Sequence, residues 1–163
     1  MIEYVKQSGI PCIVVKPTLY MENFLIPGLV SEGTLHYPVP ADKPIPWISS
    51  DDAAKYHEYA LNHPELAGKT ILAPGPEALT GTQLAERFSQ ALGEEITFHS
   101  LNYDDFEASL TPVMGAAHAA GVSGFYRWIG ANIDSLNYYD DTDRIVISDL
   151  HLTGLKDWLQ QHQ

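Results

Sequence analysis

The sequence predicts an α/β protein built on a parallel sheet, and three observations carry that prediction. Residues 12–15 and 70–73 are apolar runs, and residues 12–16 and 70–73 are therefore expected to be strands buried on both faces. Residues 81–92 carry apolar side chains at helical spacing. Buried strands that alternate with helices are typical of parallel α/β folds, and a length of 163 residues suits a single domain over 1–163.

The composition excludes several classes of function. The net charge is −12, with 21 acidic and 9 basic residues, so neither nucleic acid nor an anionic membrane surface is an expected partner. No apolar run approaches the ~18 residues that a membrane span needs. Cys12 is the single cysteine and the seven histidines show no paired spacing, so neither a disulfide framework nor a metal site is expected. A cytoplasmic protein is the resulting expectation.

The first third of the chain is expected to alternate between extended and helical pieces. Pro17 ends the first strand because it cannot donate to a sheet ladder. Cys12 lies within that strand as an inert apolar residue. The other expected elements are the end of a helix at 1–8, a short helix or helical turn at 20–31 broken by Pro27-Gly28, a strand at 34–39 and an extended piece at 45–49.

A helix is expected from Ser50 to about Asn62. Ser50, Asp51 and Asp52 suit a helix start, because their side chains can accept from free backbone N–H groups and acidic groups favour the positive end of the helix dipole. This structural role accounts for both aspartates, and a catalytic role stays open as the alternative.

Stronger signals mark the second half. Thr80 and Gln83 form a capping-box pattern, and Gly93 ends the helix that follows. The remaining expected elements are a half-exposed strand at 96–101, helices at 103–120 and 122–138 separated by Gly121, an acidic turn at 140–143, an apolar segment at 145–147 and a final helix capped by Thr153 with Leu155, Trp158 and Leu159 inward.

Candidate ligand contacts gather beyond the first strand. In open α/β sheets ligands bind at the carboxyl ends of the strands. An aromatic and polar set is expected near that end, or alternatively in an ordinary core: Tyr20, Met21, Asn23, Phe24, Trp47 and Tyr126. The sequence contains no glycine-rich phosphate loop and no GxSxG elbow, so it assigns no catalytic residue.

Three segments, taken in order, resemble the NmrA-like family of atypical short-chain dehydrogenase/reductases. They are residues 8–24, 46–54 and 68–80, and a looser likeness extends to 152–159. The resemblance implies the C-terminal half of a Rossmann-type fold that binds NAD(P), with a small substrate-covering subdomain. It further implies NADP or NAD as cofactor and either reduction of quinone-, azo- or enone-like substrates or a redox-sensing regulatory role.

Position by position, the resemblance assigns two groups of contacts. The cofactor group lies against the nicotinamide and consists of Pro17, Thr18, Leu19 and Tyr20. The substrate group lines the pocket, and Tyr126 joins it from the aromatic set: Met21, Asn23, Phe24, Trp47 and Tyr126.

The departures from the family pattern concern the half that normally precedes residue 1. The glycine-rich loop and the family's active-site Lys or Tyr belong there, and Lys16 stands where Arg is common. Cofactor binding by this chain alone is therefore expected to be weak or absent. The expected partners are a small-molecule substrate or ligand and either a second copy of the chain or a complementing N-terminal half. A non-catalytic ligand-binding or redox-sensing module, or an inactive truncated fragment, remains the alternative.

Overall fold

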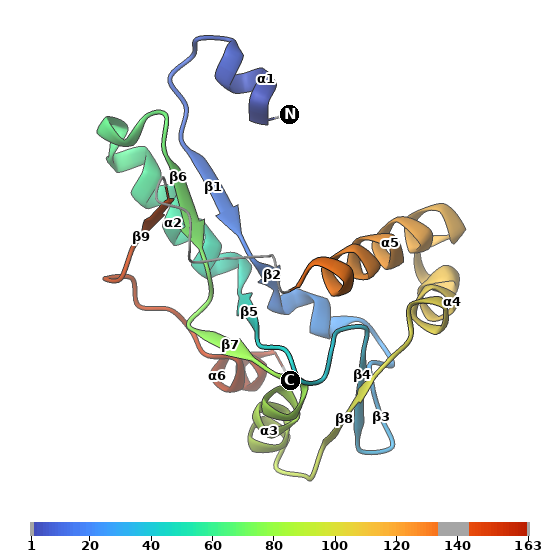
Figure 1. The fold of residues 1–163 in the computed structure, drawn as a ribbon. Coiled ribbons are helices and arrows are strands. Elements are labelled where there is room, and N and C mark those ends of the chain that lie inside the picture. The colour runs from blue at the N-terminus through green and yellow to red at the C-terminus, as the bar shows by residue number, and fades with distance from the viewer. Residues whose placement is uncertain (1, 134–143, 163) are drawn as a thin grey trace.

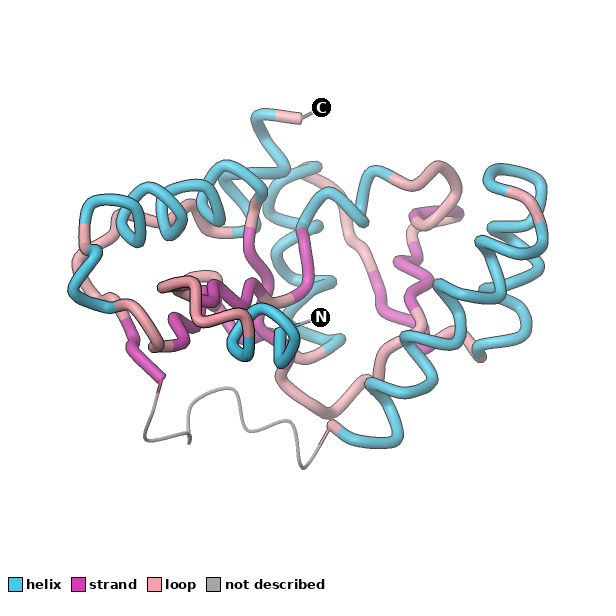
Figure 2. Tube along the Cα trace, turned by 90° about the horizontal axis from the view of Figure 1, so that it is seen from above, coloured by secondary structure: helices cyan, strands magenta, loops and turns pink. Residues whose placement is uncertain are grey.

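A computed structural model describes residues 2–133 and 144–162 of the chain. Three small three-stranded sheets form its frame, with helices packed around them (Figure 1). The first sheet lies at one end of the molecule, and helices α4 (Tyr103–Met114) and α5 (Ala116–Asn132) lie at the other end in both views (Figures 1 and 2).

The first sheet is parallel, as the apolar strands predict. Its order is β1 (Val14–Pro17), β6 (Thr70–Ala73) and β9 (Arg144–Val146), and β6 is the central strand. Helix α2 (Ser50–Asn62) packs against β1 and β6. The short helix α1 (Ile2–Gln7) precedes β1, and the 3-10 helix η2 (Pro64–Leu66) precedes β6.

The expectation that residues 12–16 are buried on both faces is wrong for β1. Val14 and Val15 are only half-buried and Lys16 is exposed. The reason is position: β1 is an edge strand, and no described residue pairs with its outer side. Cys12 lies before the strand instead of within it, and it is half-buried.

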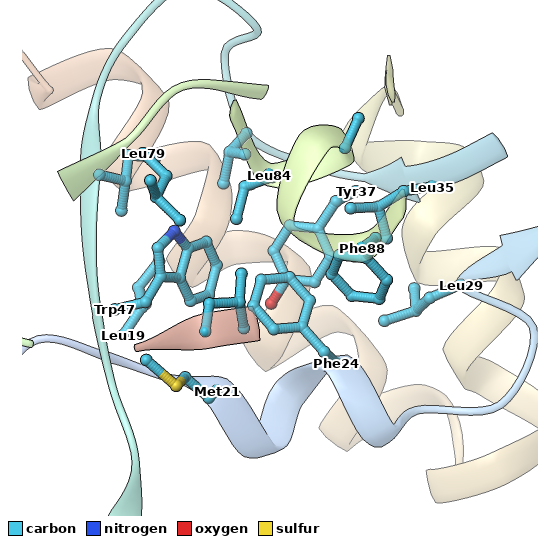
Figure 3. Close-up of a cluster of buried hydrophobic side chains, with 14 of the residues drawn as sticks. Leu19, Met21, Phe24, Leu29, Leu35, Tyr37, Trp47, Leu79, Leu84 and Phe88 are labelled. Carbon is cyan, nitrogen blue, oxygen red and sulfur yellow. The ribbon is translucent and has the colours of Figure 1, made fainter. Parts of the chain in front are cut away.

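The other two sheets and their helices enclose the larger core. One sheet contains β2 (Leu19–Tyr20), β5 (Ile45–Ile48) and β7 (Glu77–Leu79); the other contains β3 (Val30–Ser31), β4 (Thr34–Tyr37) and β8 (Thr97–Ser100). Helix α3 (Gly81–Leu92) contacts β8, β7 and α6 (Leu155–Gln161). The buried side chains between these elements form one aromatic-rich cluster (Figure 3).

Two predicted helices have different bounds in the structure. Within 20–31 the helical part is the 3-10 turn η1 (Met21–Leu25); Ile26, which precedes Pro27, is already extended with ψ 123°, and β3 follows. The break between the later helices falls at Gly115, φ +79°, and Gly121 lies inside α5. The last residues of the predicted helix 122–138 and the acidic turn 140–143 lie outside the described residues.

The predicted caps are mostly confirmed. Thr80 and Gln83 form the full capping box of α3, and Gly93 ends that helix in the left-handed conformation. Ser49, one residue before the predicted start, caps α2 by accepting from the Asp52 N–H at 3.1 Å. These side chains satisfy backbone groups that a helix terminus leaves free.

Two acidic side chains anchor the C-terminal segment. Asp52 is fully buried and accepts from the Thr153 backbone N–H at 2.7 Å and from Lys55 Nζ at 2.7 Å. The predicted cap of α6 at Thr153 is wrong, because the N-cap position is Gly154, which makes no side-chain cap bond. Glu77 accepts from the Leu155 N–H at 3.1 Å and from Arg87. Asp52 thus has a structural role, consistent with its place in the helix start.

Within the described ranges, no helix is both long and apolar enough to cross a membrane.

Candidate substrate pocket

The predicted cofactor contacts lie in sequence at the carboxyl end of β1. Pro17 is the last residue of β1, Thr18 links the strands, and Leu19 and Tyr20 form β2. The Thr18 N–H donates to the Ala73 carbonyl at 3.3 Å, which holds this loop beside the end of β6. Thr18 Oγ1 is buried without a partner in the described part of the chain, and Tyr20 is exposed. The loop therefore lies where ligands bind in parallel sheets.

Three of the predicted pocket residues lie inside the core. Met21, Phe24 and Trp47 are buried, and the Phe24 and Trp47 rings pack with their centroids 4.5 Å apart (Figure 3). Trp47 Nε1 has no hydrogen-bond partner among the described residues. All three side chains are core residues in this structure, and their direct contact with a ligand stays a prediction.

The other two predicted pocket residues meet at a cavity. Asn23 comes from η1 and Tyr126 from α5, and Asn23 Nδ2 donates to Tyr126 Oη at 3.2 Å. Both line a cavity of about 300 Å³ between these elements, together with Ile26, Gly121, Val122 and Phe125. A mostly apolar cavity with a few convergent polar groups is the usual form of a small-molecule site.

Tyr37 extends this polar pair into the core. Its hydroxyl shares a hydrogen bond with the hydroxyl of Tyr126, and the two rings pack edge to face at 5.5 Å. Tyr37 is absent from the predicted set of site residues. The signal that could have identified Tyr37 is the alternation of side chains along residues 34–37, which places Leu35 and Tyr37 on the buried face of the strand.

Burial keeps the phenols of Tyr37 and Tyr126 in their neutral, protonated form. Loss of hydration raises the pKa of Tyr126 to about 12, although its hydrogen bonds with Tyr37 and Asn23 favour the ionised form. Burial, followed by the charge of a Tyr126 phenolate, raises the pKa of Tyr37 well above 10, and the Asn23 amide opposes that rise as a donor. Both hydroxyls are thus neutral at physiological pH and can donate hydrogen bonds.

Val122 and Phe125 line the cavity but were missing from the predicted site. Together with Tyr126 they occupy positions i, i+3 and i+4 of α5, which share one helix face. All three residues lie within the predicted helix 122–138, so this spacing is the signal that could have added Val122 and Phe125 to the predicted site.

A second hollow lies beside the open edge of the first sheet. It has a volume of about 400 Å³ between β1 and α2. Apolar groups predominate among the lining residues, which are Pro11, Cys12, Ile13, Val15, His57, Ala60, Leu61, Pro64 and Ala67. Across residues 2–133 and 144–162, no cluster of His, Cys, Asp and Glu could hold a metal ion.

Sequence comparisons show that this chain is similar to known reductases. The profile of the NmrA-like family matches residues 2–150. A (4-alkanoyl-5-oxo-2,5-dihydrofuran-3-yl)methyl phosphate reductase of Streptomyces griseus is 30% identical over 108 residues, which cover 65% of this chain and 38% of that protein. An NAD(P)H azoreductase of Xenophilus azovorans is 25% identical over 111 residues, 67% of this chain and 38% of the relative. The matched region is thus less than half of either reductase.

Solved structures with a similar fold likewise match this chain over only part of their own length. A nucleoside-diphosphate-sugar epimerase structure from Staphylococcus aureus matches with TM-score 0.75 and 23% identity over 97% of this chain and 55% of its own. Citrobacter sp. triphenylmethane reductase complexed with NADP(H) matches with TM-score 0.73 and 19% identity over 99% of this chain and 57% of its own. The predicted partial Rossmann-like fold is confirmed.

Proposed function

Because the chain belongs to the NmrA-like family, we propose that it forms the substrate-binding half of an NAD(P)H-dependent reductase. The observation that carries the proposal is the extent of the match. Nearly the whole chain aligns with little more than half of a reductase structure that contains NADP(H). The cavity between η1 and α5 lies in this half and has the form of a small-molecule site.

The proposed substrates are conjugated compounds of the quinone, azo or enone type. Related reductases act, by their names, on an azo compound, a triphenylmethane dye and an oxo-dihydrofuran. The apolar lining from Ile26, Val122 and Phe125 suits a flat hydrocarbon frame, and Asn23 with Tyr126 supplies the polar contact. The support is therefore both the relatives and the chemistry of the cavity.

The proposed cofactor is NADPH or NADH, with its nicotinamide against residues Pro17 to Tyr20. Hydride supply would be the cofactor's chemistry, and this chain would contribute the surface that orients the ring. Dinucleotide binding depends on backbone N–H groups of a glycine-rich loop, and the sequence contains no such loop. We therefore propose that the chain alone binds the cofactor only weakly.

We further propose that β1 needs a neighbour in the working protein. Its outer edge is unpaired among the described residues, and the hollow beside it is lined mainly by apolar groups. An open apolar edge tends to pair with another strand. The proposed partner is a complementing N-terminal half or, failing that, a second copy of this chain. The proposed location is the cytoplasm, because one cysteine leaves no disulfide framework.

A regulatory, non-catalytic role is the second candidate. One structural match, TM-score 0.54 with 19% identity, is NmrA, described as a negative transcriptional regulator in complex with NADP. A protein of this kind would use the same cavity to hold a ligand without turnover. The missing glycine-rich loop is the feature of this chain that favours it.

Two titrations test the proposed function. Azobenzene, followed by equilibrium dialysis, should bind the chain saturably, and Asn23→Ala should weaken that binding about tenfold with little change in melting temperature. NADPH, followed by nicotinamide fluorescence, should bind with a dissociation constant above ~1 mM. Absence of azobenzene binding would refute the substrate pocket. Saturable NADPH binding tighter than about 10 μM would refute the view that this chain is only half of a cofactor site.

A further inference from the structure

Strand β8 leaves one edge of its sheet open. The sheet has the order β3-β4-β8, so β8 is an outer strand, and no described residue pairs with its outer side. The N–H of Thr97 donates to the Gly33 carbonyl at 2.9 Å, on the side of β4. Because successive residues of a strand direct their backbone groups to opposite edges, Phe98 and Ser100 present their N–H and C=O groups to the open edge.

This edge lacks the features that usually prevent a strand from pairing with another chain. Proteins commonly shorten their edge strands or place Lys or Pro in them. The edge strands β2 and β3 have two residues each, and β7 and β9 have three. Strand β8 has four residues and contains neither Lys nor Pro. Besides β1, it is therefore the described edge best suited to accept a further strand.

A hollow lies beside the open edge. Figure 1 shows β8 between β4 and helix α3, and α3 contacts the strand. The hollow between them has a volume of about 460 Å³, and its apolar lining includes Ala85 from α3 and Ile96 and Phe98 from the strand region. Alternate side chains of a strand point to the same face, so a strand added to β8 would direct every second side chain into this hollow.

The charge around the hollow is acidic. Glu86 lines it, and Glu94 and Glu95 are exposed in the turn that leads into β8. No Lys or Arg is among the described lining residues. The net charge of the whole chain has the same sign, at −12. A basic occupant is therefore attracted to this surface, and an acidic one is repelled.

We propose that β8 and α3 bind a basic, extended segment of another protein, which adds to the sheet as a fourth strand. The backbone of the segment would exchange hydrogen bonds with Phe98 and Ser100. Its alternate apolar side chains would enter the hollow, and its Lys or Arg side chains would lie near the glutamates. In this mode of recognition the backbone bonds supply affinity and the side-chain contacts supply specificity. The surface is separate from the cavity between η1 and α5, so the inference goes beyond the proposed function and does not depend on it.

A pair of synthetic peptides tests the choice of partner. The first has the sequence Lys-Val-Thr-Val-Lys-Lys, in which both valines fall on one face of an extended chain. The second, Glu-Val-Thr-Val-Glu-Glu, has the same pattern with the opposite charge. Fluorescence anisotropy of the labelled peptides at low ionic strength should show saturable binding of the basic peptide to the purified chain. The acidic peptide should bind at least about tenfold more weakly.

Two substitutions of Ser100 test the backbone pairing. Ser100→Pro removes the N–H that the added strand would bond, and an edge strand tolerates Pro where the N–H faces solvent. Ser100→Ala keeps that N–H, and both variants lose the bond from Ser100 Oγ to the Val39 carbonyl at 2.8 Å. We expect Ser100→Pro to weaken binding of the basic peptide at least about fivefold and Ser100→Ala to change it less than about twofold.

Two charge reversals test the electrostatic part. Glu86 and Glu58 are both exposed glutamates on helices, but Glu58 belongs to α2 and does not line the hollow. Glu86→Lys should weaken binding of the basic peptide about three- to tenfold, whereas Glu58→Lys, with the same change in net charge, should change it less than about twofold. Melting curves confirm that the variants fold, and if Ser100→Pro does not fold, the charge reversals and the two peptides still decide.

The opposite outcomes overturn the inference. It fails if the basic peptide does not bind saturably, if the acidic peptide binds equally well, or if Glu86→Lys and Glu58→Lys bind alike. Equal affinities of Ser100→Pro and Ser100→Ala would show that the peptide does not join the sheet. A dimer in light scattering that Ser100→Pro disrupts and Ser100→Ala retains would assign the edge to a second copy of the chain instead.

Discussion

The two hydrophobic cores of this protein differ in how completely they are enclosed. The core around Phe24, Tyr37 and Trp47 is surrounded by two sheets, η1 and helices α3 to α6. The core of the first sheet consists of a small set between one face and α2: Ile48, Ala53, Tyr56, Ala60, Ile71 and Ala73. The larger core is closed by the described residues, whereas the smaller core leaves β1 with an open edge. The candidate cavity between η1 and α5 belongs to the closed part.

The largest effect is expected at Gly75, where the two parts join. A Cβ at this position would lie 1.3 Å from the Trp47 carbonyl oxygen, so Gly75→Ala must push the link from β6 to β7 away from β5. We expect a loss of at least about 4 kcal/mol in urea unfolding, or no soluble protein. Gly124→Ala, which meets no atom within 4 Å, is the control and should be neutral or stabilising by up to ~1 kcal/mol. Equal stability of the two variants would contradict the close approach.

Removal of a buried tryptophan should lower the free energy of unfolding far more than removal of an exposed one. Trp47 is fully buried and Trp128 is 54% exposed. Trp47→Ala should cost about 3–5 kcal/mol, because it leaves a cavity in a packed aromatic cluster. Trp128→Ala should change the free energy of unfolding by less than ~1 kcal/mol. Urea titrations of both variants measure the difference, and similar losses would show that the core around Trp47 is not closed.

A smaller effect is expected where the C-terminal segment is bonded to helix α2. Asp52→Ala leaves the Thr153 N–H and Lys55 without their carboxylate, so we expect a loss of about 1–3 kcal/mol. Asp51→Ala, an exposed neighbour in the same first turn, should cost less than ~1 kcal/mol. Limited proteolysis should cut the segment after β9 faster only in Asp52→Ala. Equal cleavage of both variants would argue against the anchor.

The smallest effect at neutral pH concerns the buried tyrosines. The pKa of Tyr126 is about 12 in the folded protein and about 10 in an unfolded chain, so the fold prefers the neutral phenol. Stability is therefore fully present below about pH 10 and falls as the pH rises from there through about 12. Urea midpoints at about pH 8 and pH 11 should show the fall, and Tyr126→Phe should reduce it. A pH-independent midpoint would contradict the burial of this phenol.

Local signals predicted the elements well because they are decided by neighbouring residues. The capping box of Thr80 with Gln83 needs nothing beyond its own turn, and it formed as predicted. Gly115 and Gly121 are both plausible breaks in the sequence, and the choice between them depends on how α4 and α5 pack. The open edge of β1 could not be predicted from its apolar residues. An apolar run indicates that a strand is covered, but it does not show whether another strand pairs with each of its edges.

The sequence predicted part of the candidate site and missed the rest. Asn23 lies just beyond the first strand, where the sheet rule directs attention, and the structure brings Tyr126 to it from a distant helix. Tyr37 was missed because the sequence pattern places its side chain toward the core, and it meets the site only through long-range contacts with Tyr126 and Asn23. Contacts of that kind arise from tertiary packing, which local patterns do not contain.

The order of strands in the first sheet has a consequence for how fast the protein reaches its native state. Val14 pairs with Thr70, and Thr70 pairs in turn with Arg144, so three short strands join residues from almost the whole length of the chain. Such distant pairings are entropically costly to bring together and form late. By contrast, the α4–α5 hairpin forms from adjacent residues. On this basis we expect the pairings of the first sheet to form after the α4–α5 hairpin, and during synthesis β6 cannot pair with β9 until the residues that follow α5 have been made.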